Sequence, residues 1–177
     1  SWMGKISRIG FYFFGDFWNI FFVFWAFFQH NHIFNDNFSF EDGHVVSSLI
    51  HKCFIAKKNK TDLAVWGSGT PLREFVFADD IAKLAVWALE NYNEPSPIII
   101  SSGIETSIKT LVLLVAKKMK FTGKIVFDSS KPDGQFRKPS DTTKFLKYLP
   151  NFKFTPVETG IEKTVKWFVD NYPNVRK

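Results

Sequence analysis

A tryptophan and an arginine lie on either side of a glycine-rich turn, and their chemistry suits ligand binding. An apolar run ends at Trp66, Gly67 and Gly69 follow, Pro71 closes the turn, and Arg73 opens the next extended run. Glycines let backbone amides approach a ligand closely. An indole offers a flat face, and a guanidinium pairs with phosphate oxygens. The pattern predicts a nucleotide or sugar-phosphate site; a surface hairpin with an ordinary ion-paired arginine is the alternative.

The elements that would position this turn are two strands and a helix. The apolar run 63–66 and the extended run 73–77 are predicted to form a hairpin. A helix over 79–92 should follow, capped by Asp79, with Leu84, Ala88 and Leu89 among its buried residues.

Helical spacing also predicts a helix that starts near His44 and carries Cys53 on its apolar face, with His51 mostly off that face. Further along, we expect a short buried strand at 97–100, a helix capped by Thr106 or Ser107, a strand at 124–127 and a turn at 131–134. The last helix should have Thr155 as its N-cap, with Pro156 at its first position and Glu158 completing a capping box.

Arg73, Phe75 and Asp80 match the Arg-x-Phe-x-x-x-x-Asp signature of the extended short-chain dehydrogenase/reductases, which this chain therefore resembles. The branch of the family that makes GDP-L-fucose is similar at 36–38, 43–45, 65–71, 127–138 and 167–172. The resemblance runs from about residue 36 to the end. It implies an α/β fold: the C-terminal substrate-binding lobe of the family, a small sheet with packed helices, with most of the Rossmann domain absent.

The resemblance also implies roles for individual residues. His44 stands where the family has its catalytic histidine, which is also expected to touch NADP(H). Lys52, Trp66, Arg73 and Asp133 stand at positions that hold the GDP-sugar. The implied reaction is epimerisation of GDP-4-keto-6-deoxy-D-mannose beside its ketone, followed by reduction with NADPH.

The residues themselves leave other interpretations open. A histidine at a helix start is often a solvated or capping residue, so His44 needs no catalytic role. Asp133 could simply serve a turn, and Lys138 could be solvated rather than facing a phosphate. Lys52 replaces an arginine that family members can carry, so only a point charge would meet a phosphate there.

Two motifs needed for the family's redox step have no counterpart in the sequence. No three of its ten glycines have the Gly-x-x-Gly-x-x-Gly spacing of a dinucleotide-binding turn, and no tyrosine is followed four residues later by lysine. Cys53 does not match the family's catalytic cysteine. We therefore expect no turnover from this chain alone, although family members are expected to be homodimers. A GDP-sugar-binding or subunit-pairing module without activity is the alternative.

Composition indicates a globular protein and narrows its partners. The chain has 177 residues, a net charge of +6 and a pI near 9.4. Its lysines are dispersed, with groups at 57–60 and 117–120 at helix C-termini, where they complement the helix dipole. We therefore expect no nucleic-acid partner. One cysteine excludes an internal disulfide, and a cytoplasmic location is expected.

Residues 1–35 differ from the rest, so we divide the chain into an aromatic-rich segment at 1–35 and a substrate-binding domain at 36–177. A basic flank precedes a mostly apolar stretch at 9–28 that is rich in phenylalanine and interrupted by Asp16. The leading hypothesis is a gene-model artefact or truncated copy without family sequence there. A membrane anchor and a genuine packing segment are the alternatives.

Overall fold

The structure is a computed structural model that describes residues 36–40 and 43–176. The segment 1–35, with its possible membrane anchor at 9–28, lies outside the described residues. Within them, no helix combines the length and the apolar character needed to cross a membrane.

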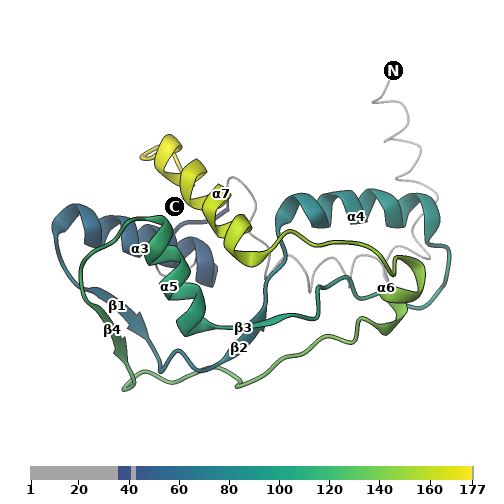
Figure 1. The fold of residues 1–177 in the computed structure, drawn as a ribbon, viewed down its shortest axis with the longest axis horizontal. Helices are drawn as coiled ribbons and strands as arrows, with labels where there is room; N and C mark the ends of the chain where they lie inside the picture. Colours follow the sequence, from purple (N-terminus) through teal and green to yellow (C-terminus); the bar gives the residue numbers. More distant parts are fainter. Residues whose placement is uncertain (1–35, 41–42, 177) are drawn as a thin grey trace.

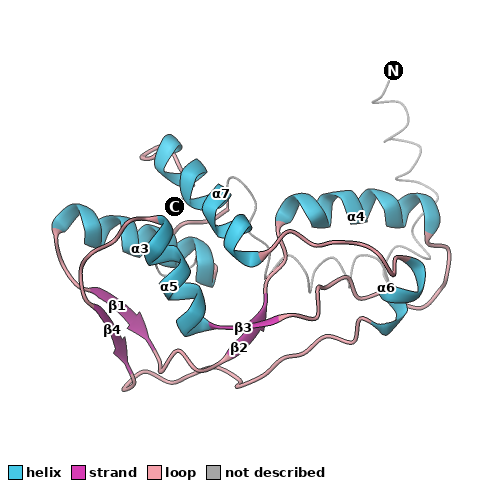
Figure 2. Ribbon diagram, in the orientation of Figure 1, coloured by secondary structure: helices cyan, strands magenta, loops and turns pink. Residues whose placement is uncertain are grey.

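One group of elements contains a parallel pair of strands, and its helices lie to one side of that pair (Figures 1 and 2). These elements are α3 (Val45–Asn59), β1 (Leu63–Trp66), α5 (Ile108–Lys118), β4 (Ile125–Asp128) and α7 (Val157–Asn171). β1 pairs with β4 in parallel, with Leu63 opposite Ile125 and Trp66 opposite Asp128. Helix α5 packs against both α3 and α7. The result confirms the predicted α/β class, a small sheet with packed helices.

A second group extends to the other end of the molecule (Figure 1). It consists of β2 (Leu72–Glu74), α4 (Ala78–Asn91), β3 (Glu105–Ser107) and α6 (Thr143–Tyr148). β2 pairs with β3 in an antiparallel arrangement, with Arg73 opposite Thr106. These two strands lie between the two groups of helices (Figure 2).

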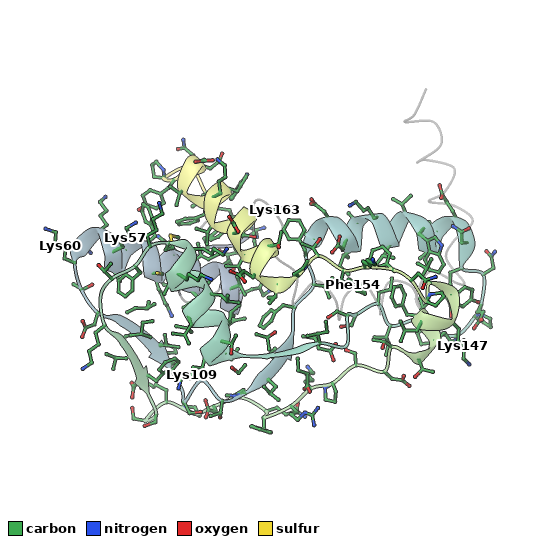
Figure 3. The ribbon with its side chains drawn as sticks, in the orientation of Figure 1. Lys57, Lys60, Lys109, Lys147, Phe154 and Lys163 are labelled. Carbon is green, nitrogen blue, oxygen red and sulfur yellow. The ribbon has the colours of Figure 1, made fainter. Side chains whose placement is uncertain are left out.

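Each group has its own hydrophobic core. Phe38, Ile50, Leu111 and Phe168 are fully buried in the larger core, which α3, α5, α7 and β1 share. The smaller core lies between α4 and α6 around Phe145, and Phe154, labelled in Figure 3, packs against it. The pocket described below is lined by residues of both groups, among them Trp66 of β1 and Arg73 of β2.

The helices form largely where the apolar periodicity predicts them. In α5, Leu111, Val112 and Val115 are buried, and the Ser107 hydroxyl caps the helix by accepting from the Thr110 amide at 3.1 Å. The basic C-terminus of α3 is tied to α5, because Lys57 Nζ donates to the Met119 carbonyl at 2.7 Å. Lys57 and Lys60 lie together at this helix end in Figure 3.

The predicted hairpin is wrong. β1 and β2 are consecutive in the sequence but belong to different sheets, so the glycine turn connects two sheets. The second strand also ends at Glu74, short of the predicted residue 77. A short strand forms where a partner lies alongside, and each of these strands finds its partner far along the chain.

The predicted helix caps, Asp79 for α4 and Thr155 for α7, are also wrong. Phe77 is the N-cap of α4 and Pro156 that of α7, and neither makes a side-chain capping bond. Instead, the Thr155 amide donates to Asp80 Oδ2 at 2.6 Å. The buried aspartate in the first turn of α4 therefore binds the backbone just before α7.

Four further predictions need correction. Residues 97–100 are not a strand, although Ile98 and Ile100 are buried in the smaller core. Leu89 lies on the outer face of α4 and is 59% exposed. His51 on α3 was expected off the apolar face but is buried. The turn predicted at 131–134 closes earlier, with the Lys131 amide donating to the Asp128 carbonyl at 3.2 Å.

Candidate functional site

Four of the five site residues predicted from the sequence line one pocket of about 500 Å³. His44 precedes α3, Trp66 ends β1, Arg73 lies in β2, and Asp133 belongs to the segment after β4. Four separate parts of the chain therefore converge on this space. Their functional roles remain predictions, but the proximity on which those roles depend is present.

The rest of the lining is apolar or lacks a side chain. Val45, Pro71, Ile108 and Pro132 contribute apolar surface, and Gly69 and Gly134 expose backbone. An apolar wall with a few converging polar groups is the usual composition of a small-molecule site.

Lys52, the fifth predicted residue, reaches the site from α3. Its Nζ lies 4.9 Å from the centroid of the Trp66 ring, and the Nζ of Lys131 lies 5.7 Å from the same centroid. The ring is 67% exposed, so it remains open to solvent beside the two ammonium groups. Cations over an indole are attracted by its quadrupole. A planar ligand on this ring would lie close to two positive charges.

Arg73 is held in the pocket by a bond to the backbone. Its Nη1 donates to the Leu72 carbonyl at 2.6 Å, and within the described part of the chain no carboxylate lies close enough to pair with it. A side chain on Gly134 would come within 3.2 Å of Nη2, so the guanidinium lies against that backbone. Since a guanidinium has five N–H donors, several remain for an anionic ligand.

Asp133 holds the glycine turn in place from across the pocket. Its Oδ1 accepts from the Ser68 amide at 2.9 Å and its Oδ2 from the Ser68 hydroxyl at 2.6 Å. The same carboxylate occupies the space above Gly67, where a Cβ would lie 2.3 Å from Oδ1. Asp133 is therefore both a pocket wall and a structural residue, and each of its oxygens already accepts one bond.

The segment that carries Asp133 is tied down at a second place. The Arg137 guanidinium binds the Glu105 carboxylate in β3, and this contact holds the pKa of Glu105 below its ordinary value. The Leu72 amide donates to the Phe136 carbonyl at 2.8 Å. The pocket wall is thus fixed to both strands of the β2–β3 sheet.

His44 has its ring oriented by a carboxylate. It is the N-cap of α3 but makes no side-chain capping bond. Its Nδ1 lies 3.2 Å from Asp36 Oδ1, with the histidine side chain 38% exposed and the aspartate 11%. The nitrogen left for the pocket is therefore Nε2.

Cys53 is remote from this chemistry. It is fully buried on α3, and burial raises the pKa of its thiol to about 11, against a smaller opposing effect from Lys57. A thiol of this kind is not a general base at neutral pH.

Among the described residues, no strand-to-helix connection fits the pyrophosphate of a dinucleotide. Such a connection requires closely spaced glycines before a helix N-terminus. The β2–α4 connection has none, the β4–α6 connection has Gly134 alone, β3 leads directly into α5, and the glycine turn joins β1 to β2. At that turn a carboxylate already faces Gly67.

Three residues of the site were missed by sequence reasoning: Asp36, Ser68 and Lys131. Asp36 belongs to a stretch used for the family resemblance, yet no spacing rule connects it to His44. Ser68 lies inside the glycine turn, where its type already suggested hydrogen bonding. Lys131 adjoins Pro132 in the predicted turn, and only the folded chain brings it to Trp66.

The α/β fold matches the C-terminal lobe of the extended short-chain dehydrogenase/reductases, and comparison with known proteins agrees with that fold. Residues 20–103 match the model of the NAD dependent epimerase/dehydratase family. The matched segment is just under half of the chain, which is thus similar to this family.

The curated proteins similar to the chain include GDP-L-fucose synthases. That of Dictyostelium discoideum is 44% identical over 145 residues, which are 81% of this chain and 45% of the relative. That of Escherichia coli is 35% identical over 152 residues, covering 80% and 47%. A GDP-L-fucose synthetase from Naegleria fowleri, whose structure bound to NADP is known, superposes with a TM-score of 0.81 at 42% identity, covering 84% and 47%. The chain therefore spans about half the length of the relatives it matches.

Proposed function

We propose that the chain is the substrate-binding half of a GDP-L-fucose synthase and that its pocket binds a GDP-linked sugar. The observation that carries this proposal is the convergence of Trp66, Arg73 and His44 on one pocket, from three elements. The guanine stacks on the open indole face. The diphosphate meets Arg73 and Lys52, which lies beside that ring at 4.9 Å.

His44 then supplies the acid for epimerisation. The ketone of the sugar acidifies the neighbouring C–H bonds, so a base can remove one proton to leave an enolate. Nε2 of a protonated His44 gives a proton to that carbon on the opposite face, and the ring becomes neutral. The base is not assigned to Cys53, because its buried thiol has a pKa of about 11.

NADP(H) would supply the hydride for the reduction step. The described residues do not fit its pyrophosphate, so no reduction step is assigned to them. We expect this chain alone to turn over no keto-sugar. Oxidation of NADPH by the purified chain with GDP-4-keto-6-deoxy-D-mannose would contradict that expectation.

Calorimetry with GDP-L-fucose tests the binding proposal. Charge-assisted hydrogen bonds contribute about 1.5–3 kcal/mol, so Arg73→Ala should weaken binding by roughly 10- to 100-fold. Lys147→Ala is the control, because Lys147 lies on α6 at the far end of the molecule (Figure 3). Unchanged affinity in Arg73→Ala would remove the proposed site.

A binding or subunit-pairing module without catalysis is the second candidate. It is favoured by the described residues, in which no strand-to-helix connection fits the pyrophosphate of a dinucleotide. Both candidates predict heat with GDP-L-fucose. A second experiment separates them: the chain is mixed with a full-length relative, NADPH and the keto-sugar are added, and the rate of NADPH oxidation is measured. A pairing module changes the rate of the full-length enzyme, and an unpaired chain does not.

A further inference from the structure

We infer that Asp36 is a positioning residue that selects the tautomer of His44 and keeps Nε2 directed to the pocket. The catalytic role of this pair rests on the proposed function, but the contact between Asp36 and His44 does not depend on it. Nδ1 of His44 lies 3.2 Å from Asp36 Oδ1. A neutral ring with its proton on Nδ1 donates to that carboxylate and presents a bare Nε2.

The ring of His44 is available for this contact because the helix start does not use it. The residue caps α3 through its backbone: its carbonyl accepts from the Ser48 amide at 2.9 Å and from the Ser47 hydroxyl at 3.0 Å. An ordinary capping histidine would direct its ring to the exposed amides of the first turn. Here no side-chain capping bond forms.

The segment that carries Asp36 is anchored independently of the histidine. Phe38 is fully buried and packs on Phe168 with ring centroids 4.8 Å apart. Its amide donates to the Arg176 carbonyl at 2.9 Å, and its carbonyl lies 2.7 Å from Nδ1 of His51. Asp36 is therefore held two residues from a fixed point, so the carboxylate can orient the ring.

The pair has a defined role in the proton transfer. In the protonated ring, Nδ1–H donates to Asp36 and Nε2–H faces the substrate carbon. When the Nε2 proton forms the new C–H bond, the electron pair of the N–H bond stays on Nε2 and the ring becomes neutral. The Asp36 carboxylate accepts from Nδ1–H before and after the transfer and so holds the ring in place. At the N-terminus of α3, that negative charge also offsets the positive end of the helix dipole.

Nitrogen-15 NMR of the imidazole rings in the free chain tests the inference, because the two tautomers have different shifts at both nitrogens. At a pH where the ring is neutral, His44 should carry its proton mainly on Nδ1. In Asp36→Ala, the Nδ1–H form should be lost as the major species in favour of Nε2–H. His51 is the internal control, because its Nδ1 contact to the Phe38 carbonyl does not involve Asp36.

A wild-type His44 with its proton mainly on Nε2 would overturn the inference, and so would an unchanged tautomer in Asp36→Ala. If Asp36→Ala also changes the nitrogen shifts of His51, the tautomer of His44 in the wild-type chain alone decides whether the inference holds. Calorimetry with GDP-L-fucose separates the two proposals. Asp36→Ala should bind within about twofold of wild type, and a tenfold loss with His51 unchanged would contradict a role exerted through His44. Absence of wild-type heat would overturn the proposed function and leave the tautomer result standing.

Discussion

The contact between Asp133 and the glycine turn makes Gly67→Ala a sharp test of the pocket's construction. Gly67 has φ = +85°, and a Cβ there would lie 2.3 Å from Asp133 Oδ1. Gly103 is a matched control: its φ is +68°, and the nearest atom to an added Cβ is Thr142 Oγ1 at 3.7 Å. Both substitutions place alanine in the left-handed region, but only one collides with a neighbour.

The two free energies of unfolding should differ for this reason. An alanine in the left-handed region destabilises the folded state by about 1–2 kcal/mol. Alanine also restricts the unfolded chain more than glycine does, which stabilises the protein by about 0.5 kcal/mol, so Gly103→Ala should lower the free energy of unfolding by about 1 kcal/mol. In Gly67→Ala the carboxylate must also move away from Ser68. Two hydrogen bonds to an exposed carboxylate add about 1–2 kcal/mol once solvent screening is allowed for, so the total is about 2–3 kcal/mol.

Urea unfolding followed by tryptophan fluorescence measures both values. A double-mutant cycle with Asp133→Ala identifies the cause, because removing the carboxylate should reduce the cost of Gly67→Ala to about 1 kcal/mol. Equal losses for Gly67→Ala and Gly103→Ala, or additive effects in the cycle, would refute the reasoning. The variant should also bind GDP-L-fucose more weakly, since the displaced carboxylate is a pocket wall.

Three further predictions concern other parts of the chain. Cys53, buried and with a thiol pKa of about 11, should resist iodoacetamide at pH 8 and react after unfolding, as mass spectrometry can show; rapid native labelling would contradict its burial. Phe168→Ala should lose about 3–5 kcal/mol of unfolding free energy, and the exposed Phe136→Ala less than about 0.5, by urea titration; similar losses would place Phe168 outside the core. Hydrogen bonds from Lys144 and then Tyr148 lower the pKa of Glu94 from 4.5 to about 2, so the stabilisation they give is present above pH 4.5 and is lost as the pH falls towards 2. Glu94→Gln should therefore be less stable than wild type at pH 6, with a smaller gap at pH 2.5; a constant gap across this window would exclude the linkage.

Helices were predictable because their periodicity is local. The buried residues of α5 and α7, Leu111 and Phe168 among them, recur at helical spacing. Their caps were less predictable, because tertiary contacts compete for the same groups. Asp80 and Thr155 both lie near expected helix starts, yet they bind each other across two helices.

Strand pairing could not be predicted from neighbouring residues. β1 and β2 are separated by a short turn with glycines, which is the usual signal for a hairpin. Their actual partners are β4 and β3, and Leu63 pairs with Ile125 far along the chain. The run 97–100 has the apolar character of a strand but packs as irregular chain in the smaller core.

The candidate site was predictable in its chemistry and less so in its geometry. Trp66 and Arg73 were singled out by their types and spacing, whereas His44, Lys52 and Asp133 depended on the family resemblance. Asp36 was not foreseen as a partner of His44. Their contact is set by how the segment before α3 docks through Phe38, and a tertiary contact of that kind leaves no periodic trace.

The same non-local pairings explain why the pocket has a defined shape although its walls come from irregular chain. The segment after β4 begins beside β1 because those strands pair in parallel, so Asp133 arrives at the Ser68 amide. Farther along, the same segment is attached to β3 at Glu105 by Arg137. Since β3 pairs with β2, which carries Arg73, both sheets fix the distance across the pocket. A change that loosens either attachment should therefore weaken binding even where no ligand-contacting residue is altered.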